Sequence, residues 1–198
     1  MTLTGCANGI PNINTEIDHG IEVSNEKIFV GIPLFASLEG TTARLDSEWI
    51  VTAAHNKLIL SMTKDEVYYH PTCDIALIRS QGTSYTEVGK VYEGQLVTHV
   101  GYPIGLPLST GKGSYVGEIV AINRGPCQMS ATTGVLMSGM SGGGTYNHRN
   151  ELVGVNHGYA WGDVQFPNVT VSQPAIFVSL YRVRDWLTEI TGNDYFLE

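Results

Sequence analysis

The sequence has little cysteine and little charge. Three of its 198 residues are cysteine, an odd number that cannot form a fully paired disulfide framework. Cys73 and Cys127 would pair only where the fold brings them together, and the sequence favours free, half-buried thiols. Charged residues make up 15% of the chain and the net charge is −8, without a basic run. This composition excludes an electrostatic surface for nucleic acid.

Long apolar runs and metal-ligand patterns are also missing. No stretch reaches the length that spans a bilayer, so we expect no transmembrane segment. No pair of histidines has metal-ligand spacing beside a cysteine or carboxylate, so we expect no metal and no cofactor. Residues 3–7 resemble a bacterial lipobox around Cys6. Two interpretations stay open: a chance match, or export and lipid anchoring at Cys6 after removal of a signal segment. The sequence carries no indication of oligomeric state.

Short strand-like runs with turn residues between them fill most of the chain. They lie at 27–34, 41–45, 48–52, 57–62, 66–69 and 75–79, and again at 95–101, 115–123, 128–131, 135–137, 152–156 and 175–180. This spacing, with 23 glycines, predicts an all-β fold of antiparallel sandwich or barrel type. The run at 27–34 reads as a buried strand.

The two groups of strands predict two domains. Residues 1–20 are polar and aperiodic, which indicates an extended arm, and the polar stretch 81–93 is the expected linker. We therefore expect one β domain over 21–85 and a second over 90–198. Long loops are expected at 105–113 and 159–174. Helical spacing of apolar residues occurs at 180–190, with Ser179 as the expected cap.

Ser141 lies in a glycine-rich stretch, 138–145, between two strand-like runs. Glycine allows a sharp turn and a close approach of a substrate carbonyl. Such a turn can direct two backbone N–H groups at one point, as an oxyanion hole requires. Taken alone, the stretch is equally consistent with an ordinary tight turn between strands.

A histidine and an aspartate upstream supply the groups that a nucleophilic serine needs. A serine requires a base within hydrogen-bond reach, and the base requires a third group that fixes its tautomer. His55 follows a strand and two alanines, and Asp74 precedes an apolar strand, so that it should be partly buried. The other histidines, His19, His70, His99 and His148, read as surface or structural residues.

Three motifs in this order resemble those of the chymotrypsin-like (trypsin-fold) serine peptidases. Residues 49–55 (Trp-Ile-Val-Thr-Ala-Ala-His) resemble the histidine motif of that family. His70-Pro71 followed by 74–77 (Asp-Ile-Ala-Leu) resembles its aspartate motif, and 139–143 (Gly-Met-Ser-Gly-Gly) its serine motif. The runs at 152–155 and 174–177 resemble the strands beside its specificity pocket. The resemblance spans about residues 27–191.

The resemblance implies a pair of six-stranded antiparallel β-barrels with the active site in the cleft between them and a C-terminal helix. It implies a serine endopeptidase that acts on protein or peptide substrates. Ser141 would be the nucleophile, His55 the general base and then acid, and Asp74 the group that orients His55. The backbone N–H groups of Gly139 and Ser141 would form the oxyanion hole.

Departures from the family's pattern limit what the resemblance implies. Met140 stands where digestive members carry an aspartate that pairs with a new N-terminus, so we expect no activation by cleavage. Gly144 replaces a common proline, and 18 residues separate His55 from Asp74, which implies short loops in the first barrel. The chain ends after the helix, so we expect none of the peptide-binding appendages of protein-quality-control proteases.

The specificity pocket is the least defined part of the prediction. Val135 is expected at its base, with Leu136 beside it and Ala175 on the opposite wall. Asn156 and His157 fall near the pocket histidine of glutamate-specific relatives, and the strand through Gly158 is expected to pair with the substrate backbone. No pocket residue is acidic, which argues against cleavage after Lys or Arg. A polar, an acidic and a medium apolar residue before the scissile bond all stay open.

Two other functions remain open. The first is a catalytically silent barrel that serves as a binding module, and the presence of all three residues, His55, Asp74 and Ser141, argues against it. The second is an esterase that uses the same three residues.

Overall fold

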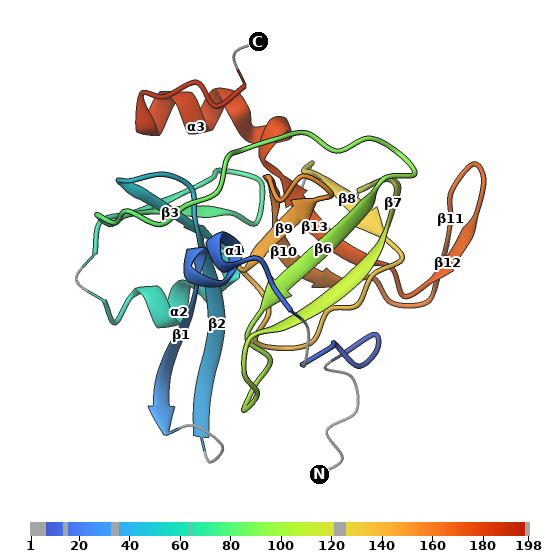
Figure 1. Cartoon of the computed structure of the whole chain (residues 1–198), viewed down its shortest axis with the longest axis horizontal. Helices are drawn as coiled ribbons and strands as arrows, with labels where there is room; N and C mark the ends of the chain where they lie inside the picture. The colour runs from blue at the N-terminus through green and yellow to red at the C-terminus, as the bar shows by residue number, and fades with distance from the viewer. Residues whose placement is uncertain (1–6, 14–15, 33–35, 64, 121–125, 197–198) are drawn as a thin grey trace.

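The computed structural model describes residues 7–13, 16–32, 36–63, 65–120 and 126–196. Figure 1 shows an N-terminal sheet beside a C-terminal barrel, with the last helix, α3, covering one end of the molecule. Cys6, the residue of the lipobox match, lies outside the described residues. None of the described helices has the length and apolar character needed to cross a membrane.

The N-terminal sheet has five antiparallel strands in the order β1-β2-β3-β5-β4. Its strands are β1 (Asn25–Ile32), β2 (Ala36–Arg44), β3 (Trp49–Thr52), β4 (Val67–Tyr69) and β5 (Ala76–Arg79). Val51 and Leu77, from the paired strands β3 and β5, are fully buried in the core. The resemblance implied six strands here, whereas the described part of this half contains five and does not close into a barrel.

One run of this half that the sequence analysis predicted to be a strand is a helix, so that prediction was wrong. The run at 57–62 forms α2 (Lys57–Leu60), directly after the short 3-10 helix η1 (Ala54–Asn56). One helical turn buries Ile59 and Leu60 and leaves Leu58 exposed. A short apolar run fits a strand or a helix equally well, so its sequence alone does not separate the two.

Half of the residues of β1 are exposed, contrary to the prediction of a buried strand. Phe29 and Ile32 are 49% and 67% exposed. Figure 1 shows the reason: β1 pairs with β2 in a long hairpin, and the C-terminal end of β1 extends away from the body of the molecule. β1 is also the edge strand of its sheet, and the apolar residues near its end remain accessible to solvent.

The C-terminal half is a closed barrel in which each strand is hydrogen-bonded to two neighbours, in the order β10-β13-β8-β7-β6-β9. The strands are β6 (Leu96–Gly101), β7 (Ser109–Val120), β8 (Gln128–Thr132), β9 (Gly144–Asn147), β10 (Leu152–Tyr159) and β13 (Ala175–Ser179). Tyr146, Val155 and Phe177 are buried inside it. The predicted all-β fold with a C-terminal helix is therefore confirmed.

Several boundaries in this half differ from the prediction. β7 begins inside the expected loop 105–113, and β9 lies where no strand was expected. The run at 135–137 contributes a single bridge, between Met137 and Ala7. The expected loop 159–174 contains a separate hairpin, β11 (Asp163–Gln165) and β12 (Thr170–Ser172), which projects from the barrel in Figure 1.

The N-terminal arm lies against the barrel. Ala7 and Asn12 form isolated bridges with Met137 and Thr110. The Asn8 side chain donates hydrogen bonds to the Gly134 and Gln173 carbonyls, at 3.0 and 2.8 Å, and accepts one from the backbone N–H of residue 136. The arm ends in a helix that the sequence analysis did not predict, α1 (His19–Ser24).

The C-terminal helix packs back on the core as predicted. It begins as a 3-10 turn, η2 (Leu180–Val183), and continues as α3 (Arg184–Thr191). Leu180, Val183 and Leu187 belong to the apolar stripe that the sequence shows, and all three are buried. Ser179 is the N-cap residue of this turn, as predicted, although its side chain makes no capping hydrogen bond.

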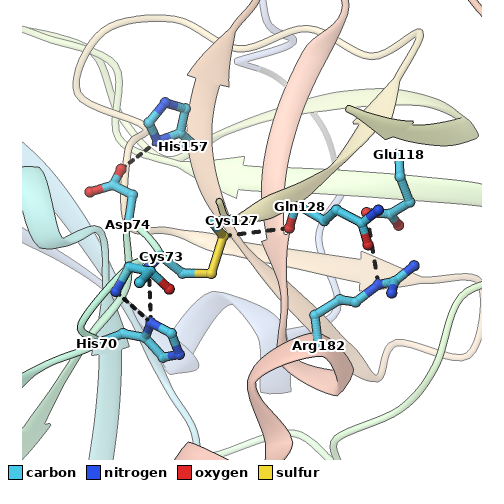
Figure 2. The surroundings of a disulfide bond; sticks show 9 residues. His70, Cys73, Asp74, Glu118, Cys127, Gln128, His157 and Arg182 are labelled. Atoms are coloured by element: carbon cyan, nitrogen blue, oxygen red, sulfur yellow. Dashed lines mark hydrogen bonds and ion pairs between the residues drawn. A yellow bond between two sulfur atoms is a disulfide. The ribbon is translucent and has the colours of Figure 1, made fainter. Parts of the chain in front are cut away.

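Cys73 and Cys127 form a disulfide, which corrects the prediction of free thiols. Their Cα atoms lie 5.0 Å apart although 54 positions separate them in the sequence. Figure 2 shows that this bond joins the loop before β5 to the start of β8, and so links the two halves. The sequence does not show the pairing because only the packing of the two halves brings these cysteines together.

Candidate active site

His55 and Asp74 lie close together because β3 and β5 are antiparallel neighbours. Thr52, the last residue of β3, pairs with Ala76, the first residue of β5. His55 follows β3 within the helix η1, and Asp74 precedes β5, so both reach the same edge of the sheet. The predicted approach of these two residues is therefore a consequence of strand pairing.

The carboxylate of Asp74 holds His55 through two hydrogen bonds. The backbone N–H of His55 donates to Asp74 Oδ1 at 2.7 Å, and His55 Nδ1 lies 2.6 Å from Asp74 Oδ2. A carboxylate only accepts, so Nδ1 carries the proton and Nε2 of a neutral His55 is left as an acceptor. Burial would raise the pKa of Asp74, but hydrogen bonds from His157 and His55 outweigh it and keep that pKa below its ordinary value.

A second histidine binds the same carboxylate. His157, on β10, places its Nδ1 within hydrogen-bond distance of Asp74 Oδ2 (Figure 2). Its side chain is 8% exposed, and its ring lies 5.5 Å from that of His55 in an edge-to-face arrangement. The sequence analysis placed His157 near the substrate pocket but missed this contact. No local pattern signals it, because Asp74 and His157 belong to different halves of the molecule.

Ser141 sits at the boundary between the two halves. Its carbonyl accepts hydrogen bonds from the Thr41 N–H at 2.9 Å and the Asn56 side chain at 3.2 Å. Its hydroxyl donates to the His157 carbonyl at 3.0 Å, and among the described residues no hydrogen bond joins it to His55. Catalytic hydrogen bonds are often long or unmade before substrate binds. A rotation about the Cα–Cβ bond is what would turn the hydroxyl toward His55.

The backbone around Gly139 leaves two N–H groups unused. The carbonyl of Ser138 accepts from the Ile104 N–H at 2.9 Å, and that of Met140 accepts from the Gly143 N–H at 3.1 Å. In a planar trans peptide the N–H points opposite to the carbonyl, so these bonds fix the directions of the next N–H groups, those of Gly139 and Ser141. Neither N–H donates to any residue that the structure describes. Two unused donors beside a serine hydroxyl fit the geometry of an oxyanion hole.

Glycine is required at 139 and 142 for the same two reasons. Gly139 has a φ of +96°, and a Cβ there would lie 2.5 Å from the Tyr102 carbonyl oxygen. Gly142 has a φ of +91°, and its Cβ would lie 2.1 Å from the Thr41 carbonyl of the other half. Both positions combine a left-handed conformation with a close backbone approach, which a side chain cannot tolerate.

Two cavities flank Ser141. We call the first the His157 cavity; it has about 200 Å³ and is lined by Leu136, Met137, Ser138, Ser141, His157, Gly158, Tyr159 and Trp161. We call the second the Ile104 cavity; it has about 360 Å³ and is lined by Ser37, Leu38, Glu39, His55, Asn56, Leu58, Ile59, Ile104, Ser138, Gly139 and Ser141. Ser141 therefore lies between the two cavities and lines both.

The structure separates the residues that the sequence analysis assigned to the pocket. Leu136 and Gly158, with His157, line the His157 cavity. Val135 faces a different cavity, together with residues 10, 12 and 110–112. Ala175 is fully buried in an apolar cluster with Leu136 and Met140, below the cavity wall.

Asn156 lies inside the barrel, where a substrate does not reach it. It is fully buried, and its side-chain amide donates to the Val100 carbonyl at 2.8 Å. Its carbonyl oxygen lies 2.8 Å from Nδ1 of His99, which is also fully buried. The ring of His99 is satisfied on its other side by Thr132, at 2.8 Å. His99 is therefore a structural residue, as the sequence analysis expected.

His55, Asp74 and His157 also have the ligand types of a metal site. One ligand atom from each lies within 4.8 Å of the others. Two imidazoles and a carboxylate suit Zn²⁺. In this structure, however, both Nδ1 atoms of the group are already engaged with the carboxylate by hydrogen bonds. The arrangement has a complete explanation as a hydrogen-bonded network.

Comparison with known proteins supports the fold. No protein-family model and no curated protein matches the chain. Among solved structures, the Rv3671c protease from M. tuberculosis in its active form has a TM-score of 0.68 and 18% identity, over 96% of this chain and 92% of that one. The MamO protease domain from Magnetospirillum magneticum has a TM-score of 0.61 and 18% identity, over 85% of this chain and 97% of that one.

A third similar structure contains a bound peptide. It is the S227A form of the HtrA-type protease AlgW with a decapeptide, with a TM-score of 0.61 and 12% identity. The match covers 85% of this chain but 63% of that one. At these identities the likeness shows that the chain has the trypsin-like fold of such protease domains; activity has to be argued from the site itself.

Proposed function

We propose that this protein is a serine endopeptidase that hydrolyses peptide bonds through an acyl-enzyme. The observation that carries the proposal is the placement of one serine hydroxyl beside two unused backbone N–H groups, with an aspartate-bound histidine lining the same cavity. Each part has a role in acyl transfer, and the three parts come from segments far apart in the sequence. The trypsin-like fold supports the same assignment.

In the proposed reaction, Ser141 Oγ attacks the substrate carbonyl while His55 Nε2 takes its proton. The N–H groups of Gly139 and Ser141 stabilise the negative charge that develops on the carbonyl oxygen. His55 then gives the proton to the leaving amine as the C–N bond breaks. Water repeats the sequence on the acyl-enzyme, and Asp74 keeps the proton on Nδ1 throughout and stabilises the imidazolium that forms.

The packing of Met140 supports the prediction that the serine turn is held without an activating ion pair. Its side chain is fully buried and packs in an apolar cluster with Leu136 and Ala175. Apolar burial of this kind stabilises a loop without any cleavage of the chain. It supports the proposal that the chain folds directly into a competent form.

A fluorophosphonate probe tests the nucleophile. The Ser141 oxygen would bond to phosphorus, fluoride would leave, and mass spectrometry would locate the adduct on the peptide that contains Ser141. Ser138→Ala is the matched control, since Ser138 lines both cavities but has no role in the proposed chemistry. We expect labelling of the wild type and of Ser138→Ala, and none of Ser141→Ala. A folded wild type that stays unlabelled would favour the silent binding module.

A peptide library separates a peptidase from an esterase. Cuts by the wild type that Ser141→Ala does not make would support the endopeptidase. Turnover of small esters without a single peptide cut would favour the esterase instead.

A further inference from the structure

The Ile104 cavity has three half-exposed aliphatic walls. Leu38, Leu58 and Ile104 are 45%, 54% and 44% exposed. They come from three separate elements: β2, α2 and the loop between β6 and β7. Scattered apolar residues are normal on a protein surface, but several that converge on one cavity mark a binding site.

The cavity lies on the side from which the leaving part of a substrate departs. His55, Gly139 and Ser141 all line it, whereas the residues that line the His157 cavity include Ser141 but not His55. In the proposed mechanism His55 protonates the leaving amine, so the departing chain must lie within hydrogen-bond reach of His55. An extended chain advances about 3.3 Å per residue, so the first two residues after the scissile bond would lie over this cavity.

Glu39 holds two of these walls in place. Its side chain is completely buried, and its carboxylate accepts hydrogen bonds from Lys27 Nζ at 2.5 Å and from Ser37 Oγ at 2.7 Å. It also accepts one from the Gly105 N–H at 3.3 Å. Glu39 follows Leu38 on β2, and Gly105 follows Ile104 in its loop, so one buried carboxylate ties the two walls together. The cavity is therefore formed before a substrate arrives.

The charge of Glu39 also shapes what the cavity accepts. The ammonium group of Lys27 compensates the carboxylate, so the cavity presents no unpaired negative charge to a basic side chain. An acidic side chain would approach the buried carboxylate of Glu39, and the residues that line the cavity include no lysine or arginine. A large apolar side chain gains contact with three aliphatic walls and leaves no polar group unsatisfied.

From these contacts we propose that this protein selects substrates with a large aliphatic or aromatic residue at one of the first two positions after the scissile bond. This inference rests on the proposed peptidase function. The selected side chain lies between Leu38, Leu58 and Ile104. Burial of one such side chain corresponds to a preference of roughly ten- to a hundredfold in kcat/KM over alanine or serine.

Matched peptides test the selection. Each carries the same residues before the scissile bond, taken from library cuts by the wild type, and Leu, Phe, Ala, Ser or Asp at the first or second position after it. We expect Leu and Phe to give the highest kcat/KM at one of these positions, and Asp to give the lowest. Cleavage that is equally fast for all side chains at both positions would overturn the inference while leaving the peptidase function intact.

Leu58→Ser tests the wall itself, because Leu58 is exposed and lies outside the proposed catalytic groups. It should reduce the preference for Leu and Phe about tenfold, the amount expected when an apolar contact of this size is lost. Leu96→Ser is the control: this leucine is 62% exposed on β6 and does not line the cavity. It should leave the preference unchanged. Full preference in Leu58→Ser would contradict the assignment.

A small-ester substrate distinguishes failure of the inference from failure of the function. Its leaving alcohol is too short to reach the aliphatic walls, so its turnover by the wild type and by Leu96→Ser measures the proposed function without the selected side chain. No ester turnover and no fluorophosphonate labelling in the wild type would remove the proposed function, and the inference with it. Normal ester turnover with unselective peptide cleavage would remove the inference alone.

Discussion

The two halves of this molecule differ in how their site residues are fixed. The C-terminal barrel is closed, and it supplies the groups whose backbone must be rigid, Ser141 and the two unused N–H groups. The N-terminal sheet is open, and it supplies His55 and Asp74 from loops at one edge. The open half therefore contributes side chains whose positions depend on contacts outside its own sheet.

Three of those contacts run to the barrel. Asp74 binds His157, its neighbour Cys73 is bonded to Cys127, and Thr41 Oγ1 donates to the Gly139 carbonyl at 2.7 Å. Asp74 is thus held by its own hydrogen bond to the other half and by the disulfide of the preceding residue, Cys73. The closed barrel therefore forms the rigid part of the site, and these contacts attach the open sheet to it.

The largest expected effect tests whether the halves form one catalytic unit. Ser141→Ala should lower kcat about 10⁶-fold, and Asp74→Asn about 10⁴-fold, because Asn cannot hold His55 in the required tautomer. The double variant should be within about tenfold of Ser141→Ala, since groups that act together are not additive. Steady-state peptide cleavage measures this. A kcat of the double variant that is lowered by the product of the two single losses would show that the halves act independently.

Removal of the disulfide tests how much this link between the halves contributes to the free energy of unfolding. Replacing both Cys73 and Cys127 by serine should lower the free energy of unfolding by about 4 kcal/mol, the chain-entropy value for a loop of this length. Urea unfolding of the wild type and the variant, followed by tryptophan fluorescence, measures the difference. The wild type in excess dithiothreitol is the matched control and should approach the variant. Equal midpoints for wild type and variant would show that the link contributes nothing to the fastening.

The smallest effect concerns the barrel alone. Burial lowers the pKa of His99 to about 4, from an ordinary value of 6.5, and a hydrogen bond to Asn156 offsets only part of this. Between these values the unfolded chain binds a proton that the folded barrel does not. His99 therefore leaves the free energy of unfolding unchanged above pH 6.5. As the pH falls from 6.5 toward 4, that free energy decreases by roughly 1 kcal/mol per pH unit.

Urea unfolding at several pH values measures this slope, and His99→Gln removes the titrating group. The slope between pH 6.5 and 4 should be shallower in the variant, whatever its absolute stability. Asp74 does not interfere in this range: its lowered pKa means that its contribution is lost only as the pH falls below about 4. Identical slopes in the wild type and the variant would contradict the assignment of the effect to His99.

Much of the candidate site follows from local sequence. The strand that leads to His55, the strand that follows Asp74 and the glycine turn at Ser141 are all visible as patterns. They are visible because each depends on a short segment: apolar runs form strands, and glycine permits the turn. The pairing of β3 with β5 then brings His55 and Asp74 to one edge.

The prediction failed where one segment had two physical solutions. The run at 57–62 became a helix because one turn buries Ile59 and Leu60. The predicted buried strand, β1, is partly exposed because it lies at the edge of its sheet. Asn156 and His157 are adjacent on β10, but Asn156 is fully buried inside the barrel, whereas His157 reaches Asp74 and the cavity. Which face a residue takes depends on strand register, which the local sequence did not specify.

The sequence by itself determined the strand-rich architecture, the C-terminal helix and the three segments that carry His55, Asp74 and Ser141, because periodicity and turn chemistry are local properties. Only the tertiary structure decided the contacts between the halves: the second histidine on Asp74, the disulfide between Cys73 and Cys127, and the aliphatic walls of the Ile104 cavity. Each of these joins segments that the chain holds far apart, and only the packing of a barrel against a sheet brings them within bonding distance.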